Sequence, residues 1–218
     1  VGSCTGRDHF SGWGLDWINI GLTYLPYLHR FYAPADARSA FLAIIDAAAH
    51  YGGHIIGIPR DNLPVLARQD GSGPLWEATD AWEPVTTFRT YKGAEHAILA
   101  FGAPAFVAED AAAKLAKKGV PTDVHIINGL PLEARQLEHL LAPYTAGVVT
   151  IEDGLIGNAY TGVSGFAGLV ASTAADAGLP VSHIGITDPT TAPADGHMET
   201  WAHFGITSAA LVKAVQDL

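Results

Sequence analysis

Three charged or titratable side chains stand where they could bind or protonate a small molecule. Arg60 follows the apolar run at residues 54–58 (HIIGI), which we predict to be a strand buried on both faces. Open α/β sheets bind ligands at the carboxyl ends of their strands, and a guanidinium fork matches a phosphate or carboxylate. Asp8 and His9 lie in a glycine-rich stretch, residues 6–14 (GRDHFSGWG). A neutral imidazole beside a carboxylate suits general acid/base chemistry or hydrogen bonding to sugar hydroxyls.

Each of these residues also has a structural alternative. Arg60 could pair with the adjacent Asp61 or with a carboxylate of another domain. Asp8 could cap a turn that leaves His9 facing the solvent. The sequence alone leaves both alternatives open.

Other titratable residues give no metal site. His54, His125 and His183 each lie in an apolar run, where a hydrogen-bonded role is commoner than metal ligation. We therefore predict no structural metal. Glu152 and Asp153 lie at the end of an apolar strand and could be a paired-carboxylate site or a structural element.

Composition narrows the classes of function. The 218 residues carry 12 Lys and Arg against 22 Asp and Glu, a net charge of −10, which is the wrong sign for nucleic acid or an anionic membrane surface. With 49% apolar and 16% charged residues the chain can build a large core. The single cysteine, Cys4, cannot form an internal disulfide, so a soluble, cytoplasmic protein is expected. The chain begins with Val1, and we expect it to be a piece of a larger protein.

Strand-like and helix-like runs alternate along the chain, which predicts an α/β architecture with a mostly parallel sheet. A strand at 28–31 precedes a helix capped by Asp36, whose apolar residues from Phe41 to Ala49 recur at helical spacing on one face. The strand at 54–58 completes one β-α-β unit. Residues 67–84 lose this periodicity and collect Gly, Pro and acidic side chains, so we predict a linker there. Further strands are predicted at 97–101, 123–128, 148–152 and 181–186, and helices at 105–118, 132–141, 162–177 and from 208.

Four short stretches, in this order, resemble the transketolase superfamily of thiamine-diphosphate enzymes. Residues 30–37 (RFYAPADA) resemble the family's RPADA segment, and residues 59–66 (PRDNLPVL) resemble its SRQNLPVL segment. Residues 149–154 (VTIEDG) resemble the VTVEEG strand end, and residues 203–207 (HFGIT) resemble the FGIT ending. The resemblance covers nearly the whole chain.

The resemblance implies a division of the chain into parts. Residues 1–66 would be the rear of a thiamine pyrimidine-binding domain, 67–84 a linker, and 85–218 a complete three-layer α/β/α transketolase C-terminal-like domain. The front of the pyrimidine-binding domain would be missing from the chain. The cofactors implied are thiamine diphosphate and Mg²⁺. Their diphosphate and metal ligands would lie on a partner chain or a missing segment, and no cofactor-binding residue can be assigned in this chain.

The resemblance also suggests roles for individual residues. Arg60 corresponds to the arginine that binds the phosphate end of the sugar, and Arg30 is included with it among the predicted substrate-binding residues. Residues 6–14 occupy the place of the family's GEDGPTHQ loop, which makes Asp8 and His9 candidate catalytic and substrate-binding residues. Gly12 or Trp13 stands where the family histidine is expected, and His9 lies a few residues earlier.

The function implied is that of a C-terminal subunit of a split transketolase, moving a two-carbon ketol unit between sugar phosphates or related anionic substrates. Such a subunit would pair with a partner carrying the diphosphate-binding domain and would dimerise through its own C-terminal domain, giving a heterotetramer. The resemblance would then place Glu152 and Asp153 at the dimer interface, which is the structural role that we favour for them. Two alternatives remain: an enzyme like deoxyxylulose-phosphate synthase or the beta subunit of 2-oxo-acid dehydrogenases, and a non-catalytic assembly subunit.

Overall fold

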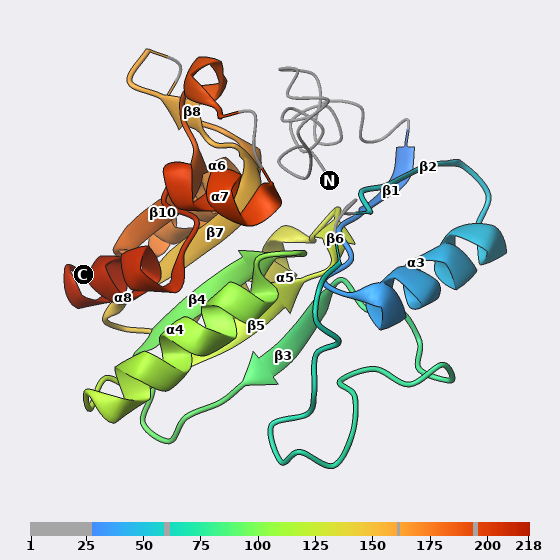
Figure 1. Ribbon diagram of the computed structural model, residues 1–218, viewed down its shortest axis with the longest axis horizontal. Coiled ribbons are helices and arrows are strands. Elements are labelled where there is room, and N and C mark those ends of the chain that lie inside the picture. Colours follow the sequence, from blue (N-terminus) through green and yellow to red (C-terminus); the bar gives the residue numbers. More distant parts are fainter. Residues whose placement is uncertain (1–27, 59–61, 161, 194–195) are drawn as a thin grey trace.

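A five-stranded sheet forms the centre of the larger part of the molecule. The computed structural model describes residues 28–58, 62–160, 162–193 and 196–218 (Figure 1). The strand order is β10-β7-β4-β5-β3, with β3 antiparallel to β5 and the other neighbours parallel. The strands are β3 (Val85–Arg89), β4 (His96–Phe101), β5 (Thr122–Ile127), β7 (Gly147–Leu155) and β10 (Val181–Ile186). The predicted α/β class with a mostly parallel sheet is confirmed.

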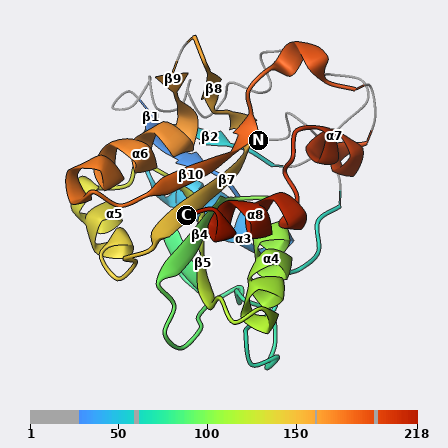
Figure 2. The same ribbon diagram turned by 90° about the vertical axis from the view of Figure 1, so that its left-hand side faces the viewer.

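Helices cover both faces of this sheet, so this part of the chain has three layers (Figures 1 and 2). The helices are α4 (Ala105–Lys117), α5 (Ala134–Leu141), α6 (Gly165–Ala177) and α8 (Ser208–Gln216). Alternate residues of β4 belong to different cores: Ile98 and Ala100 pack with α4 and α8, whereas Leu99 and Phe101 pack with α5 and α6. Because side chains alternate across a strand, one apolar strand supplies both cores.

A smaller sheet, of order β2-β1-β6, lies beside the first. It consists of β1 (Leu28–Tyr32), β2 (Gly53–Ile56) and β6 (Gly129–Leu130), with β1 parallel to β2 and antiparallel to β6. Because β6 closely follows β5, it joins the two sheets. The join is tight, since a Cβ on Gly102 would lie 2.7 Å from the backbone oxygen of Ala33.

Helix α3 (Ala37–Ala49) connects β1 to β2, which confirms the elements of the predicted β-α-β unit. The burial predicted for the second strand is wrong. In β2, Gly53 is exposed and the next three residues are only half-buried. The physical reason is that β2 is an edge strand in the part of the chain that the structure describes, with β1 as its partner.

The remaining elements lie mainly near the carboxyl ends of the large sheet. They are the hairpin strands β8 (Gly157–Asn158) and β9 (Gly162–Val163), the 3-10 turn η2 (Pro189–Thr191) and α7 (His197–His203) (Figure 2). Residues 67–84 contain one isolated bridge, between Ala67 and Pro74, and Trp76 is buried in the core beneath α4. None of the helices in the described ranges is both long enough and apolar enough to cross a bilayer.

Candidate functional site

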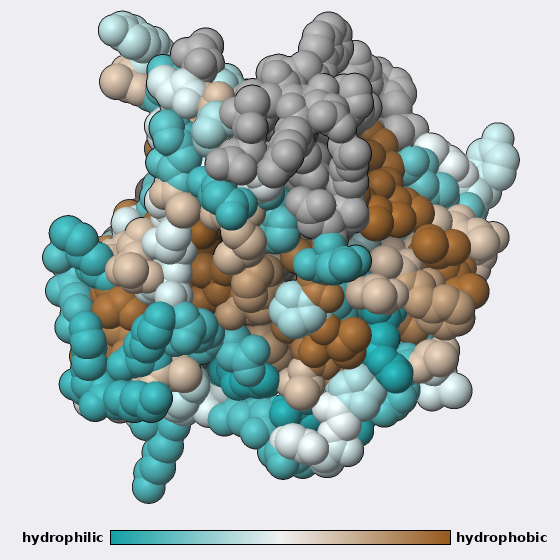
Figure 3. Space-filling model, viewed as in Figure 1, coloured by the Kyte–Doolittle hydropathy of each residue, from teal (hydrophilic) through white to brown (hydrophobic). Residues whose placement is uncertain are grey.

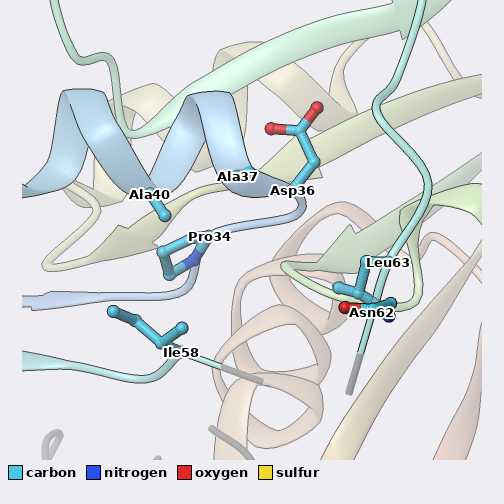
Figure 4. Close-up of a pocket in the computed structure, with 7 residues that line it drawn as sticks. All are labelled: Pro34, Asp36, Ala37, Ala40, Ile58, Asn62 and Leu63. Carbon is cyan, nitrogen blue, oxygen red and sulfur yellow. The ribbon is translucent and has the colours of Figure 1, made fainter. Parts of the chain in front are cut away.

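A pocket of about 180 Å³ lies where the parallel strands β1 and β2 end and α3 begins (Figure 4). Carboxyl ends of parallel strands beside a helix N-terminus are where open α/β sheets bind ligands. The pocket is lined by Pro34, Asp36, Ala37, Ala40, Ile58, Asn62 and Leu63. Its walls are thus mainly apolar, with Asn62 as a polar residue, whereas the Asp36 carboxylate points away from Ile58 and Asn62 (Figure 4).

Asp36 builds the pocket rather than offering a free charge to it. Its Oδ1 accepts a hydrogen bond from the backbone N–H of Ser39 at 2.8 Å, which caps α3. The Ser39 hydroxyl oxygen in turn accepts the backbone N–H of Asp36 at 3.0 Å, completing a capping box. The Oδ2 of Asp36 accepts the N–H of Leu66 at 2.9 Å. Asp36 therefore ties the chain that follows residue 61 to the start of α3.

The sequence prediction recognised Asp36 only as a helix cap. Its second contact, to Leu66, joins residues 30 positions apart, and nothing in the local pattern indicates it. Asn62 was not predicted as a site residue either. Its position two residues after Arg60, at the exit of a strand, is the signal that could have found it.

Of the predicted site residues, only Arg30 lies within the described part of the chain; Asp8, His9 and Arg60 lie outside the described residues. Arg30 is on β1, and its guanidinium forms an ion pair with Asp46 of α3 and lies 4.5 Å from the ring centroid of Trp82. Tyr32 also donates its hydroxyl to Asp46, at 2.6 Å. The structure therefore gives Arg30 internal partners, and its role in substrate binding stays a prediction.

The contacts of Arg30 and Tyr32 with Asp46 determine the charge of this carboxyl. Burial opposes the charge of Asp46, but hydrogen bonds from Tyr32 and Arg30 outweigh it and hold the pKa of this carboxyl below its usual value. Burial and the hydrogen bond to Asp46 raise the pKa of the Tyr32 hydroxyl, so it remains a donor. An ionised carboxylate is thus held between two donors, an arrangement that fixes β1 against α3.

Glu152 and Asp153 are fully buried near the end of β7. Glu152 accepts the backbone N–H groups of Phe166 (3.2 Å) and Ala167 (2.7 Å) at the start of α6. Burial raises the pKa of Glu152 to about 8, against the opposing effect of these two hydrogen bonds. Burial also raises the pKa of Asp153.

Glu152 binds the N-terminus of α6, where the helix dipole favours an acceptor. Asp153 also contributes to the raised pKa of Glu152, so the paired-carboxylate alternative stays a prediction. A Cβ on Gly165 would lie only 2.9 Å from the Glu152 carboxylate, so the glycine permits this contact. These contacts support the structural role that we favoured, and the predicted dimer interface stays a prediction.

All three strand histidines are hydrogen-bonded within the fold, and a ring nitrogen of His54 lies 3.1 Å from the backbone oxygen of His50. His125 contacts the hydroxyls of Thr87 and Tyr144, and His183 contacts Thr150 at 3.0 Å. Burial lowers the pKa of the His125 and His183 imidazoles. In the described ranges no group of three or more His, Cys, Asp or Glu residues is placed to hold a metal ion. We assign none of the described residues to Mg²⁺.

The fold resembles several solved structures. A split-gene transketolase, described as an inactive β4 tetramer, matches with a TM-score of 0.76 over 93% of this chain and 61% of that chain, at 23% identity. The chain has a transketolase-like fold. A transketolase mutant from Pichia stipitis matches with a TM-score of 0.67 at 16% identity, over 91% of this chain and 26% of that one. Transketolase from Campylobacter jejuni matches with a TM-score of 0.66 at 15% identity, over 94% and 28% of the two chains.

These matches confirm the resemblance to transketolases that the sequence motifs indicated. The chain spans only 61% of the split-gene protein's length and about a quarter of the other two. No protein-family model and no curated protein matches the sequence.

Within the transketolase-like fold, the motifs fall at junctions between elements. The RFYAPADA stretch runs from β1 into α3, and the HFGIT stretch leads into α8. Thr207 caps the N-terminus of α8, because its side chain accepts a hydrogen bond from the N–H of Ala210 at 3.2 Å. The VTIEDG stretch lies inside β7, which continues to Leu155, beyond the predicted strand end. Part of the PRDNLPVL stretch lines the pocket, through Asn62 and Leu63.

Proposed function

We propose that this chain is the rear part or subunit of a thiamine-diphosphate-dependent, transketolase-like enzyme. It would move a two-carbon ketol unit between sugar phosphates or related substrates, together with a partner subunit that carries the diphosphate-binding domain. The observation that carries the proposal is the match to a split-gene transketolase over 93% of this chain, with a pocket at the strand ends of the shared fold.

The surface of α3 supports the need for a partner. Phe41, Ile44 and Ile45 are each about half exposed, at 46%, 47% and 53%. Ile58 and Val65 are similarly exposed, at 52% and 55%. Figure 3 shows apolar side chains gathered over this side of the molecule. Contiguous apolar surface of this kind is typical of a protein–protein interface.

The proposed roles of the site residues follow the resemblance. Arg60 would hold the anionic end of the substrate, and the residues that flank it in sequence, Ile58 and Asn62, line the pocket. Asp8 and His9 would line the entrance and exchange protons with substrate hydroxyls. Arg30 would contribute to substrate binding.

Thiamine diphosphate, when bound, would supply the stabilisation of the carbanion. This chain would supply binding, orientation and proton transfer, while the partner would hold the diphosphate and Mg²⁺. Residues 85–218 would form the homodimer contact, consistent with a heterotetramer.

Activity measured with and without a partner tests the proposal. The chain is purified alone and after co-expression with candidate chains that carry a diphosphate-binding domain. Each preparation is assayed with a ketose-phosphate donor and an aldose-phosphate acceptor. We expect ketol transfer only with both chains, thiamine diphosphate and Mg²⁺ present. Decarboxylation of pyruvate without ketol transfer would instead favour a deoxyxylulose-phosphate-synthase-like or 2-oxo-acid dehydrogenase-like enzyme. Absence of any thiamine-dependent activity in a stable complex would favour a non-catalytic assembly subunit.

Arg60→Ala in the active complex tests the anion-binding role. Loss of a charge-assisted bidentate contact, about 1.5–3 kcal/mol, lowers kcat/KM for phosphorylated substrates roughly 10- to 150-fold. Arg68→Ala is the matched control, because Arg68 is a nearby exposed arginine whose partner is Glu77 at 3.8 Å. Equal kinetics for the two variants would remove Arg60 from the site.

A further inference from the structure

A groove of about 350 Å³ lies between α4 and α8, away from the α3 pocket, with which it shares no lining residue. Its floor is apolar and includes Ala209 and Val212 of α8. Three lysines also line this groove: Lys114 of α4, Lys118 immediately after α4, and Lys213 of α8. Three lysine side chains therefore line one cavity.

The concentration of positive charge here is exceptional for this protein. The chain carries a net charge of −10 and only five lysines, of which four (Lys114, Lys117, Lys118 and Lys213) lie on α4, immediately after it, or on α8. Figure 3 shows the corresponding hydrophilic side chains over these two helices. The described part of the chain thus presents a lysine-rich groove, which attracts anions locally.

Two contacts across the helices hold lysines over the groove. The Nζ of Lys114 donates to the hydroxyl of Ser208 at 2.8 Å, and the Nζ of Lys118 donates to the side-chain oxygen of Gln216 at 3.3 Å. Both contacts place an α4 ammonium group against α8. The charges are therefore partly pre-organised, which reduces the entropic cost of binding.

The existing carboxylate partners of the lysines are weak competitors. Lys114 pairs with Asp110 at 2.6 Å and Lys213 pairs with Asp217, each four residues away on its own helix. All four side chains are about half exposed or more, and such surface pairs contribute little and are screened by salt. Lys118 is bonded to an amide rather than to a carboxylate. A multiply charged anion can replace these contacts.

Helix dipoles account for only part of this arrangement. Cations are favoured in the last turn of a helix, which suits Lys117 at the end of α4. The dipole does not require three lysines from two helices to line one cavity. Lysine is a point charge that binds phosphate well, and an apolar floor suits the uncharged part of a ligand.

We propose that the groove between α4 and α8 binds a small organic di- or triphosphate, with its phosphates on Lys114, Lys118 and Lys213 and its organic part on Ala209 and Val212. The ligand class is that of a nucleoside di- or triphosphate. This site is separate from the proposed ketol-transfer site and does not depend on that function.

Calorimetric titration of the full chain, within its complex if a partner co-purifies, tests the proposal with ADP and tripolyphosphate as probes. We expect saturable binding of ADP at about 10 µM to 1 mM, weakened as salt is raised. The double variant Lys118→Ala/Lys213→Ala should weaken ADP binding at least about tenfold. Lys92→Ala is the matched control, since Lys92 is the one lysine outside this region, and it should change the affinity less than about twofold.

Three results would overturn the proposal. The first is no saturable ADP binding, and the second is equal affinity in the double variant and the Lys92→Ala control. The third is binding of tripolyphosphate without ADP, because it would leave the apolar floor with no role. Matching thermal melting curves confirm that the variants are folded. Because the readout is binding, failure here leaves the ketol-transfer assay unaffected, and failure of that assay leaves this result standing.

Discussion

Asp36→Ala should weaken the attachment of Leu66 to the start of α3, beside the pocket. The carboxylate of Asp36 is 3% exposed and makes two separate backbone contacts, to Ser39 within α3 and to Leu66 thirty residues later. Alanine removes both acceptors at once. The variant therefore tests whether one side chain both starts the helix and anchors the chain beyond residue 61.

The size of the effect follows from the two contacts. Loss of an N-cap costs about 1 kcal/mol of unfolding free energy, with a range of roughly 0.5–2 kcal/mol. Leu66 is buried, so its N–H loses its partner without gaining water, which costs about 1–3 kcal/mol more. The expected total is about 2–4 kcal/mol. For a chain of this size that corresponds to a fall in Tm of roughly 4–16 °C.

Urea unfolding followed by circular dichroism and tryptophan fluorescence measures this loss. Thr207→Ala is the matched control, because Thr207 caps α8 with one backbone contact, to Ala210, and should cost only about 1 kcal/mol. Asp36→Asn should fall between the two variants, since an amide keeps the cap but sets a donor against one of the two N–H groups. The reasoning is refuted if Asp36→Ala is no more destabilising than Thr207→Ala.

Three further predictions concern stability and association. A double-mutant cycle of Arg30→Met and Asp46→Asn should give a coupling free energy of about 1–2 kcal/mol in urea unfolding, because the ion pair is largely buried. A coupling free energy near zero would contradict a stabilising ion pair between these two residues. Because the pKa of Glu152 is raised to about 8 in the folded state, that state binds more protons than the unfolded chain, so the unfolding free energy should fall as pH rises from about 4.5 to about 8. Glu152→Gln should flatten this part of the stability curve, and parallel curves for the two proteins would contradict the shift. Ile45→Glu on the exposed face of α3 should change Tm by less than about 2 °C yet weaken association with a partner chain in sedimentation velocity; a large fall in Tm would show that the face is buried within the chain.

Elements with strong local signals were predictable from the sequence. The strand predicted at 181–186 matches β10, and the helix predicted at 105–118 matches α4 to within one residue. Continuous apolar runs mark buried parallel strands, and late lysines with a following glycine mark a helix end. These signals depend only on neighbouring residues, so no knowledge of the tertiary fold is needed to read them.

Elements defined by distant partners were not predictable in the same way. Strand β6 has two residues and exists because Leu130 pairs with Phe31, about a hundred positions earlier. The contacts at the candidate functional site also divide into local ones, which were predictable, and distant ones, which were not. The cap formed by Asp36 was predictable from its neighbours, whereas its bond to Leu66 and the contact between Arg30 and Asp46 depend on the folded chain.

The apolar residues of helix α3 show what a periodic pattern can and cannot predict. Its apolar spacing correctly predicts a helix, yet the residues that face the chain's own core are Ser39, Leu42 and Ala43, while Phe41 and Ile44 stay half exposed. A periodic pattern tells which residues share a helix face, but not whether the surface that covers them belongs to the same chain. Ala37 and Ala40 of this helix also line the pocket, as does the exposed Ile58. A partner that covered the exposed side of α3 would therefore also border the pocket, so the proposed function predicts that association affects ligand binding in the pocket.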